Sequence, residues 1–174
     1  MEAPQYPAGP FTSEEVCDAR RRDQLIADIE AAPRLLRESI ARLSATQLDT
    51  KYRNWTIRQI VHHIADSHVN SYIRFKWTLT EETPTIKAYD EGRWAVLDDS
   101  RGGDVGAPLA LMEGVHKSWL QLLRAMTPEQ FARSFRHPET KQLVSLSSAL
   151  CYYAWHGKHH TGQILWLRKQ NGWT

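Results

Sequence analysis

One segment near the C-terminus, from Trp155 to Gln163, constrains this chain more than any other. It runs Trp-His-Gly-Lys-His-His-Thr-Gly-Gln and holds three of the eight histidines. Side chains four residues apart lie one above the other on an α-helix, so His156 and His160 point the same way. They fall in the middle of an apolar stripe formed by Leu146, Ala149, Leu150, Tyr153, Ile164 and Leu167. The pattern predicts a helix with two imidazoles on its core-facing side.

Two inward imidazoles on one helix favour a metal site. A single inward histidine is more often a hydrogen-bonded core residue, but here each of two buried polar rings needs a partner. Neutral imidazole is the commonest metal ligand in proteins, and the i,i+4 spacing lets one cation bind both rings. Gly157 follows His156 and no glutamate lies between the pair, which excludes the HExxH zinc proteases. His159 falls on the flank of the stripe.

Length and composition favour one domain over residues 1–174. A chain of this length can bury a full core but is short for two domains. The 22 Lys and Arg nearly balance the 20 Asp and Glu, without a nucleic-acid-binding patch. Cys17 and Cys151 make no disulfide framework, and no segment has the pattern of a signal peptide or membrane span. We expect a cytoplasmic protein that binds neither nucleic acid nor membrane.

Three further segments have the apolar spacing of amphipathic helices. They cover about residues 13–43 or 18–43, 56–82 and 107–126. Pro33 should kink the first of these helices or break it in two. A capping box from Thr56 to Gln59 marks the start of the second. Residues 1–12 are rich in Pro and Gly, and we expect an extended arm there.

Residues 83–105 separate the second and third helices without any periodicity. A loop of this length is uncommon in a compact domain unless it serves as a lid, a crossover or a binding loop. The polar turn at residues 44–48 returns in similar form at residues 127–131, which suggests two related helix pairs. We therefore predict an all-α four-helix bundle with a long crossover loop between helices 2 and 3.

The second helix carries a polar flank beside its apolar face. The flank consists of His63, Asp66, Ser67, Asn70 and Arg74. His63 is the residue of this helix best placed to reach a cavity shared with the fourth helix, so it is the third candidate ligand. His62 should point to the far side and be exposed. His68 lies among apolar residues and should be a hydrogen-bonded core histidine.

These motifs resemble a known family. Residues 55–68, 70–76 and 80–84, together with the C-terminal His-Gly-Lys-His-His-Thr-Gly-Gln, are similar to the YfiT branch of the DinB-like superfamily. The similarity spans nearly the whole chain. It implies a metal-binding four-helix bundle, commonly dimeric, with His63, His156 and His160 as ligands. Gln163 resembles the wider superfamily's His-His-x-Gly-Gln, where the YfiT branch should have another histidine.

The three histidines would leave a zinc ion with an open position, which is typical of catalytic sites. Zinc lowers the pKa of a bound water toward about 7, so a metal-dependent hydrolase with a metal-activated water is the first hypothesis. Nickel or another first-row ion would suit the same ligands, with one ion per chain. Asp66 is a candidate for proton transfer or for orienting a ligand. Asn70 and Arg74 are candidates for binding an anionic group of a small-molecule substrate.

Two other functions stay open. The ion could bind a low-molecular-weight thiol as a thiolate, and relatives are implicated in transferring bacillithiol-type thiols to electrophiles. Arg74 or Lys76 on the rim of the cavity would favour this S-transferase, as would the lack of a clear general base. The third function is that of a non-enzymatic metal-binding stress protein. Its structural zinc would need a fourth protein ligand, for which His68 and His159 are the candidates.

Overall fold

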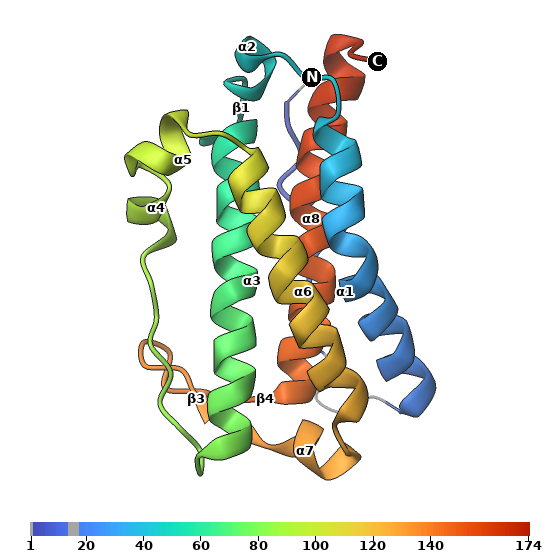
Figure 1. Cartoon of the computed structure of the whole chain (residues 1–174), viewed down its shortest axis with the longest axis vertical. Coiled ribbons are helices and arrows are strands. Elements are labelled where there is room, and N and C mark those ends of the chain that lie inside the picture. Colours follow the sequence, from blue (N-terminus) through green and yellow to red (C-terminus); the bar gives the residue numbers. More distant parts are fainter. Residues whose placement is uncertain (1, 14–17) are drawn as a thin grey trace.

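Four long helices make up most of the structure, a computed structural model that describes residues 2–13 and 18–174. They are α1 (Ala19–Ile40), α3 (Ile57–Thr80), α6 (Gly106–Ala125) and α8 (Leu146–Asn171). In Figure 1, α1 and α8 run upward, whereas α3 and α6 run downward. Helices α1 and α3 each pack against α6 and α8, so α1 and α3 lie across the bundle from each other. The predicted four-helix bundle is confirmed.

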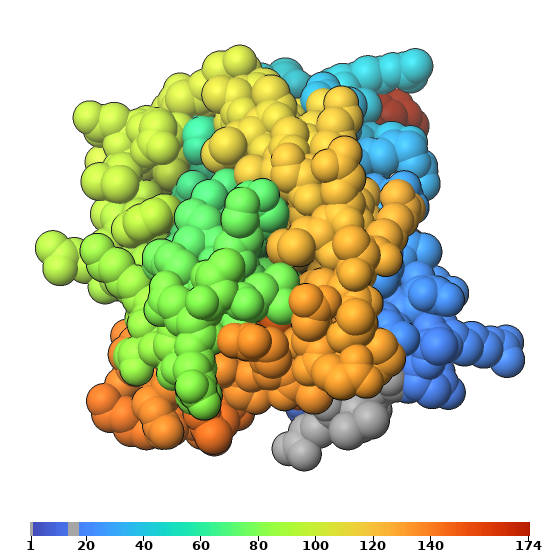
Figure 2. All heavy atoms as spheres, turned by 60° about the horizontal axis from the view of Figure 1, so that its bottom comes forward, coloured from blue at the N-terminus to red at the C-terminus, as the bar shows by residue number. Residues whose placement is uncertain are grey.

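The crossover between α3 and α6 follows from this arrangement. Because the two helices are neighbours that run in the same direction, the chain must return along the length of the bundle between them. The returning segment contains α4 (Glu91–Trp94) and α5 (Asp98–Gly102) and lies beside α3 (Figures 1 and 2). Arg58 donates to the carbonyl of Gly103 at 2.7 Å, and Gln59 donates to that of Ala95 at 2.7 Å. These bonds fasten the crossover to the start of α3.

The other two links have similar structures. Each begins with a short helix closed by a capping box, α2 (Ala45–Leu48) after α1 and α7 (Pro128–Ala132) after α6. Each then forms an antiparallel two-stranded hairpin. The first pairs β1 (Lys51–Tyr52) with β2 (Trp55–Thr56), and the second pairs β3 (Ser134–Arg136) with β4 (Leu143–Ser145). The sequence did not predict these strands, because two or three residues are too few to show an alternating pattern.

Helix α1 differs from its prediction at Pro33. The helix continues from Ala19 to Ile40 through this residue, so the alternative of a break is not found. Pro33 is buried in the bundle, and this packing compensates for the backbone hydrogen bond that proline cannot make. Of the two predicted starts, the one at Asp18 is observed, since its carboxylate accepts from the amide of Arg21 at 2.7 Å. Residues 14–17, including Cys17, lie outside the described residues.

The core is divided into two apolar clusters with a polar layer between them. One cluster, around Phe75 and Trp119, joins the N-terminal halves of α1 and α8 to the C-terminal halves of α3 and α6. The other, around Ile64 and Met112, joins the opposite halves of the same helices. Between them, the buried side chains of α3, α6 and α8 include the histidines His63, His68, His116, His156 and His160. Among the described helices, none has the length and apolarity needed to cross a bilayer.

Residues 2–13 form no helix or strand and lie along α8. The indole of Trp155 donates to the carbonyl of Gly9 at 2.9 Å, and the hydroxyl of Tyr52 donates to that of Pro4. The ring of Tyr6 packs against His159, with centroids 5.9 Å apart. The arm therefore covers the face of α8 that points away from the bundle axis.

Candidate metal centre

His63, His156 and His160 come together in the polar layer. His63 is near the start of α3, and the other two lie one turn apart on α8. The nitrogen atoms that they could offer as ligands all lie within 4.8 Å of one another, and the Nε2 atoms of His63 and His156 are 3.2 Å apart. Nitrogens bound to one tetrahedral zinc ion are about 3.3 Å apart. The spacing is therefore suitable for a single metal ion.

Burial keeps these three imidazoles neutral. Loss of hydration, with a smaller contribution from the neighbouring His159, lowers the pKa of His63 to about 4. The same loss lowers the pKa values of His156 and His160 well below the usual range, and the other rings of the cluster add to the effect. A neutral imidazole has a lone pair for a metal ion, whereas an imidazolium has none. At neutral pH all three rings can act as ligands.

Gln163 determines which nitrogen of His160 carries that lone pair. Its Oε1 lies 2.9 Å from Nδ1 of His160 and can only accept, so Nδ1 is protonated and Nε2 is free to bind a metal. The amide nitrogen of Gln163 donates to Nε2 of His159 at 3.1 Å. Trp55 packs beside the cluster, with its ring centroid 4.6 Å from that of His63. This residue comes from β2, directly before the capping box of α3.

The described residues offer no fourth protein ligand. The cluster of histidine, cysteine and carboxylate side chains there contains three members. His68 contacts His156 from behind, with its Nε2 3.4 Å from Nδ1 of that ring, and His159 is bonded to Gln163. Neither candidate for a closed structural site is thus in place. The arrangement leaves room for water or substrate.

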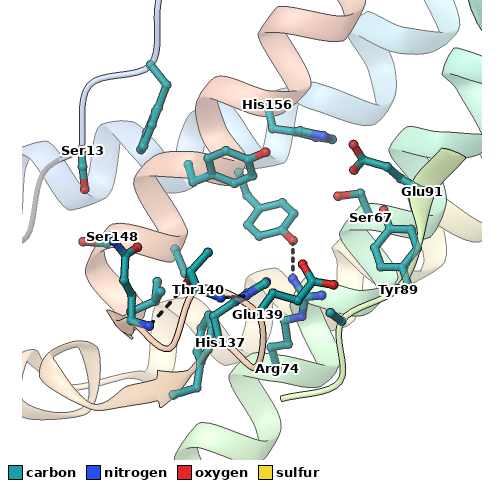
Figure 3. A pocket seen from close by; sticks show the side chains of 18 of the residues that line it. Ser13, Ser67, Arg74, Tyr89, Glu91, His137, Glu139, Thr140, Ser148 and His156 are labelled. Carbon is teal, nitrogen blue, oxygen red and sulfur yellow. Dashed lines mark hydrogen bonds between the residues drawn. The ribbon is translucent and has the colours of Figure 1, made fainter. Parts of the chain in front are cut away.

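A cavity of about 740 Å³ lies beside His156 (Figure 3). The arm, α3, the crossover, the β3–β4 hairpin and α8 all contribute to its walls. Its polar lining includes Ser67, Arg74, Tyr89, Glu91, His137 and Glu139. On α3, Ser67 lies one turn beyond His63 and Arg74 three turns, about 16 Å, beyond it. The volume is within the range of small-molecule sites, so a substrate can extend from His156 toward Arg74.

The cavity carries charges of both signs. The guanidinium of Arg74 donates to the hydroxyl of Tyr153 and to the carbonyl of Lys87, each at 3.3 Å, while its buried Nε has no partner. On the crossover, burial raises the pKa of Glu91, and the nearby carboxylates of Asp90 and Glu139 raise it further. Partial burial also raises the pKa of Tyr152, a residue that is 38% exposed, to about 12, so its hydroxyl stays protonated.

Known proteins are similar to this chain over nearly its whole length. The family model of the DinB superfamily matches residues 28–164. A Bacillus subtilis (strain 168) protein named "Putative metal-dependent hydrolase YfiT" is 45% identical over 171 residues, which cover 97% of this chain and 96% of that protein. The chain belongs to the DinB superfamily.

A second relative and a solved structure place it within the superfamily. A Bacillus cereus (strain 03BB102) protein named "Putative metal-dependent hydrolase" is 46% identical, over 97% of this chain and 98% of that protein. The structure of YfiT from Bacillus subtilis, described as "a probable metal-dependent hydrolase with an unusual four-helix bundle topology", matches with a TM-score of 0.94 and 45% identity. It covers 97% of this chain and 98% of that chain. The predicted YfiT branch is confirmed.

The polar residues predicted on α3 of this DinB-superfamily protein lie in different places. Arg74 lines the cavity, whereas Asp66 and Asn70 are not among the described residues that do. The amide of Asn70 donates to the backbone carbonyl of Asp66 at 2.9 Å, within its own helix. Burial raises the pKa of Asp66 to about 6, and the charge of Asp99 on the crossover contributes. The roles of Asp66 and Asn70 stay predictions.

For two other histidines of α3, His62 and His68, the helical periodicity predicted whether the side chain is exposed or buried. His62 was expected to be exposed, and this is wrong: the side chain is buried, near Asp99 of α5. Helical periodicity shows to which face of the helix a side chain belongs, but it does not show that the crossover covers that face. His68 is fully buried, as expected, and its Nδ1 is 2.8 Å from Nε2 of His116.

Glu91 and Tyr89 are cavity residues that the sequence did not identify. Both come from the crossover, and Glu91 is the first residue of α4. Figure 3 shows Ser67, Tyr89 and Glu91 close together on one side of the cavity, with the Glu91 carboxylate directed inward. The unusual length of the crossover was the available signal, since loops of this length often serve as lids or binding loops.

Proposed function

We propose that this protein is a hydrolase that uses one divalent metal ion, preferably zinc, held by His63, His156 and His160. The observation that carries the proposal is the convergence of three neutral imidazoles beside a cavity, without a fourth protein ligand among the described residues. The names of the similar Bacillus proteins support it. Imidazole nitrogens also suit nickel and other first-row ions, so the metal content has to be measured.

The metal ion, when bound, would supply Lewis acidity and lower the pKa of a water ligand toward about 7. The chain's own part is to hold and move protons. Glu91 is the residue that we assign as proton acceptor, because its carboxylate faces the cavity and its partial burial raises its pKa toward the working range of a general base. Tyr152 stays protonated and can donate a hydrogen bond to the oxygen on which charge develops.

Replacing Glu91 by glutamine tests this assignment. We expect the variant to keep its zinc and to lose about 10²- to 10⁴-fold in kcat, the usual contribution of a general base. The measurement is hydrolysis of ester, amide and phosphoester panels by the zinc-loaded protein. Glu139→Gln, in the same cavity but on the β3–β4 hairpin, is the matched control. It removes a carboxylate that raises the pKa of Glu91 but not the proposed base itself, so it should change kcat far less than E91Q. A kcat unchanged in E91Q would exclude Glu91 as the base, and a fully loaded wild type that hydrolyses nothing on the panels would exclude the hydrolase.

Transfer of a low-molecular-weight thiol is the second candidate function, and the position of Arg74 favours it. The three histidines would hold an ion that lowers the pKa of a thiol, and the cavity beside His156 would hold the electrophile. Such thiols carry anionic groups, and Arg74 presents a cation with an unpartnered Nε. Lys76, the other candidate, lies 3.4 Å from the hydroxyl of Tyr72 and is not among the described residues that line the cavity.

Arg74→Met should separate anionic from neutral thiols. We expect its KM for a bacillithiol-type thiol to rise about 10- to 100-fold, because one charge-assisted hydrogen bond contributes about 1.5–3 kcal/mol. The KM for an uncharged thiol should not change. The assay is zinc-dependent conjugation of monochlorobimane, with Lys76→Met as the control for removing a neighbouring charge. This function is not supported if the zinc-loaded wild type forms no conjugate. It is also not supported if R74M raises the KM for the charged and the uncharged thiol equally.

A further inference from the structure

A chain of hydrogen bonds joins His156 to all four long helices. Nδ1 of His156 on α8 is 3.4 Å from Nε2 of His68 on α3. Nδ1 of His68 is 2.8 Å from Nε2 of His116 on α6, and Nδ1 of His116 is 2.8 Å from the backbone carbonyl oxygen of Ile29 on α1. The three rings are at most 3% exposed, so water cannot replace these partners.

The backbone carbonyl of Ile29, at the end of this series of hydrogen bonds, sets the donor and acceptor of every bond in it. A carbonyl oxygen only accepts, so His116 must carry its proton on Nδ1, and the neutral ring then has its lone pair on Nε2. That lone pair accepts from Nδ1 of His68, whose own Nε2 in turn accepts from Nδ1 of His156. His156 is left with its lone pair on Nε2, the atom that lies 3.2 Å from Nε2 of His63.

Packing also fixes the rings against rotation. His116 stacks on His68, with centroids 4.9 Å apart and an interplanar angle of 17°. Trp119 and Tyr153 make T-shaped contacts with His68, at centroid distances of 6.1 and 5.3 Å. A histidine pair that served only to fill the core would need no such alignment of donors and acceptors toward one outer atom.

We propose that His68 and His116 are positioning residues for His156. They hold it in the tautomer that presents Nε2 to the metal and couple metal binding to the packing of all four helices. This inference rests on the metal centre proposed above. Metal-bound histidines usually donate their second N–H to a carboxylate or a carbonyl, and such partners affect affinity by about 10- to 100-fold. Here the carbonyl of Ile29 acts through two neutral rings, so His156 is oriented without a negative charge that would weaken the Lewis acidity of the ion.

Zinc affinity measured by competition with a chelator tests the positioning role. We expect His68→Leu to weaken zinc binding about 10- to 100-fold, because Nδ1 of His156 loses its acceptor. His68→Gln keeps an acceptor oxygen at the position of Nε2 and should restore most of the affinity. His116→Leu should also weaken binding, although it touches no proposed ligand. The control is His62→Leu. His62 is a buried histidine of α3 that takes no part in the hydrogen bonds from His156 to Ile29, so this variant should bind zinc like wild type. Wild-type affinity in both H68L and H116L would overturn the proposal.

The tautomers can be observed directly in metal-free wild type, without relying on any variant to fold. Long-range ¹H–¹⁵N NMR spectra of the imidazoles should show the proton on Nδ1 in His116, His68 and His156. A proton on Nε2 of His156 would overturn the inference. A wild type that shows these tautomers and binds no zinc would support the hydrogen-bonded chain while excluding the metal centre, so the two failures can be told apart.

Discussion

His156→Ala should abolish stoichiometric zinc binding. The variant retains two of the three converging imidazoles. One ligand of a zinc site contributes about 2.5–4 kcal/mol if the total binding free energy of such sites is divided equally among four ligands. The dissociation constant should therefore rise about 10²- to 10³-fold, and His68 would lose the donor that its Nε2 now accepts from. The measurement is zinc per chain after dialysis against a weak chelator, followed by hydrolysis and conjugation assays on the same samples.

The matched control is His137→Ala. His137 lines the same cavity from the β3–β4 hairpin but lies outside the three-histidine cluster, so its variant should keep one zinc per chain. Wild-type zinc affinity in H156A would contradict the proposed metal centre. Loss of zinc with both activities intact would instead show that the metal does not take part in the chemistry, and the assignment of Glu91 would then have to be tested without it.

The sequence could bring His156 and His160 together because their relation is local. Four residues on one helix fix the direction of both side chains, whatever the rest of the chain does. His63 required one further step, since the polar flank of α3 shows a direction but not a partner. The structure supplies that partner, with Nε2 of His63 next to Nε2 of His156. The four helices could likewise be predicted from the sequence, because each has an apolar stripe that has to be buried.

Contacts between segments that are distant in the sequence could not be predicted in this way. His116 lies on α6, 48 residues after His68, and nothing in its own helix indicates that it bonds to another histidine. Tyr89 and Glu91 belong to a segment without periodicity, so neither their direction nor their wall of the cavity could be inferred. His62 was misplaced for the same reason, since its burial depends on a crossover that packs there. Periodicity also does not tell which helices are neighbours, and so it could not show that α1 and α3 lie across the bundle from each other.

The buried histidine layer should make the metal-free protein sensitive to mild acid. Burial lowers the pKa of His63 and of His116 to about 4, whereas a histidine in the unfolded chain titrates near 6.5. Between these two values the unfolded chain binds protons that the folded protein does not. The contribution to stability is therefore complete above about pH 6.5 and is lost as the pH falls toward 4. Burial also lowers the pKa values of His68, His156 and His160.

The expected loss is large compared with the stability of a domain. Lowering a pKa from 6.5 to about 4 corresponds to about 3–4 kcal/mol, so His63 and His116 alone account for about 7 kcal/mol, against a typical total of 5–15 kcal/mol. Urea unfolding of the zinc-free protein, followed by circular dichroism at pH 7.5, 6.5, 5.5 and 5.0, should show a midpoint that falls steeply below pH 6.5. Zinc binds the folded state and should raise the midpoint at pH 7.5, with less effect as protons compete for the histidines. His137→Gln lies outside the layer and should follow wild type. A midpoint that stays constant from pH 7.5 to 5.0 would contradict the neutral state of the buried rings, and with it the lone pairs that the metal centre requires.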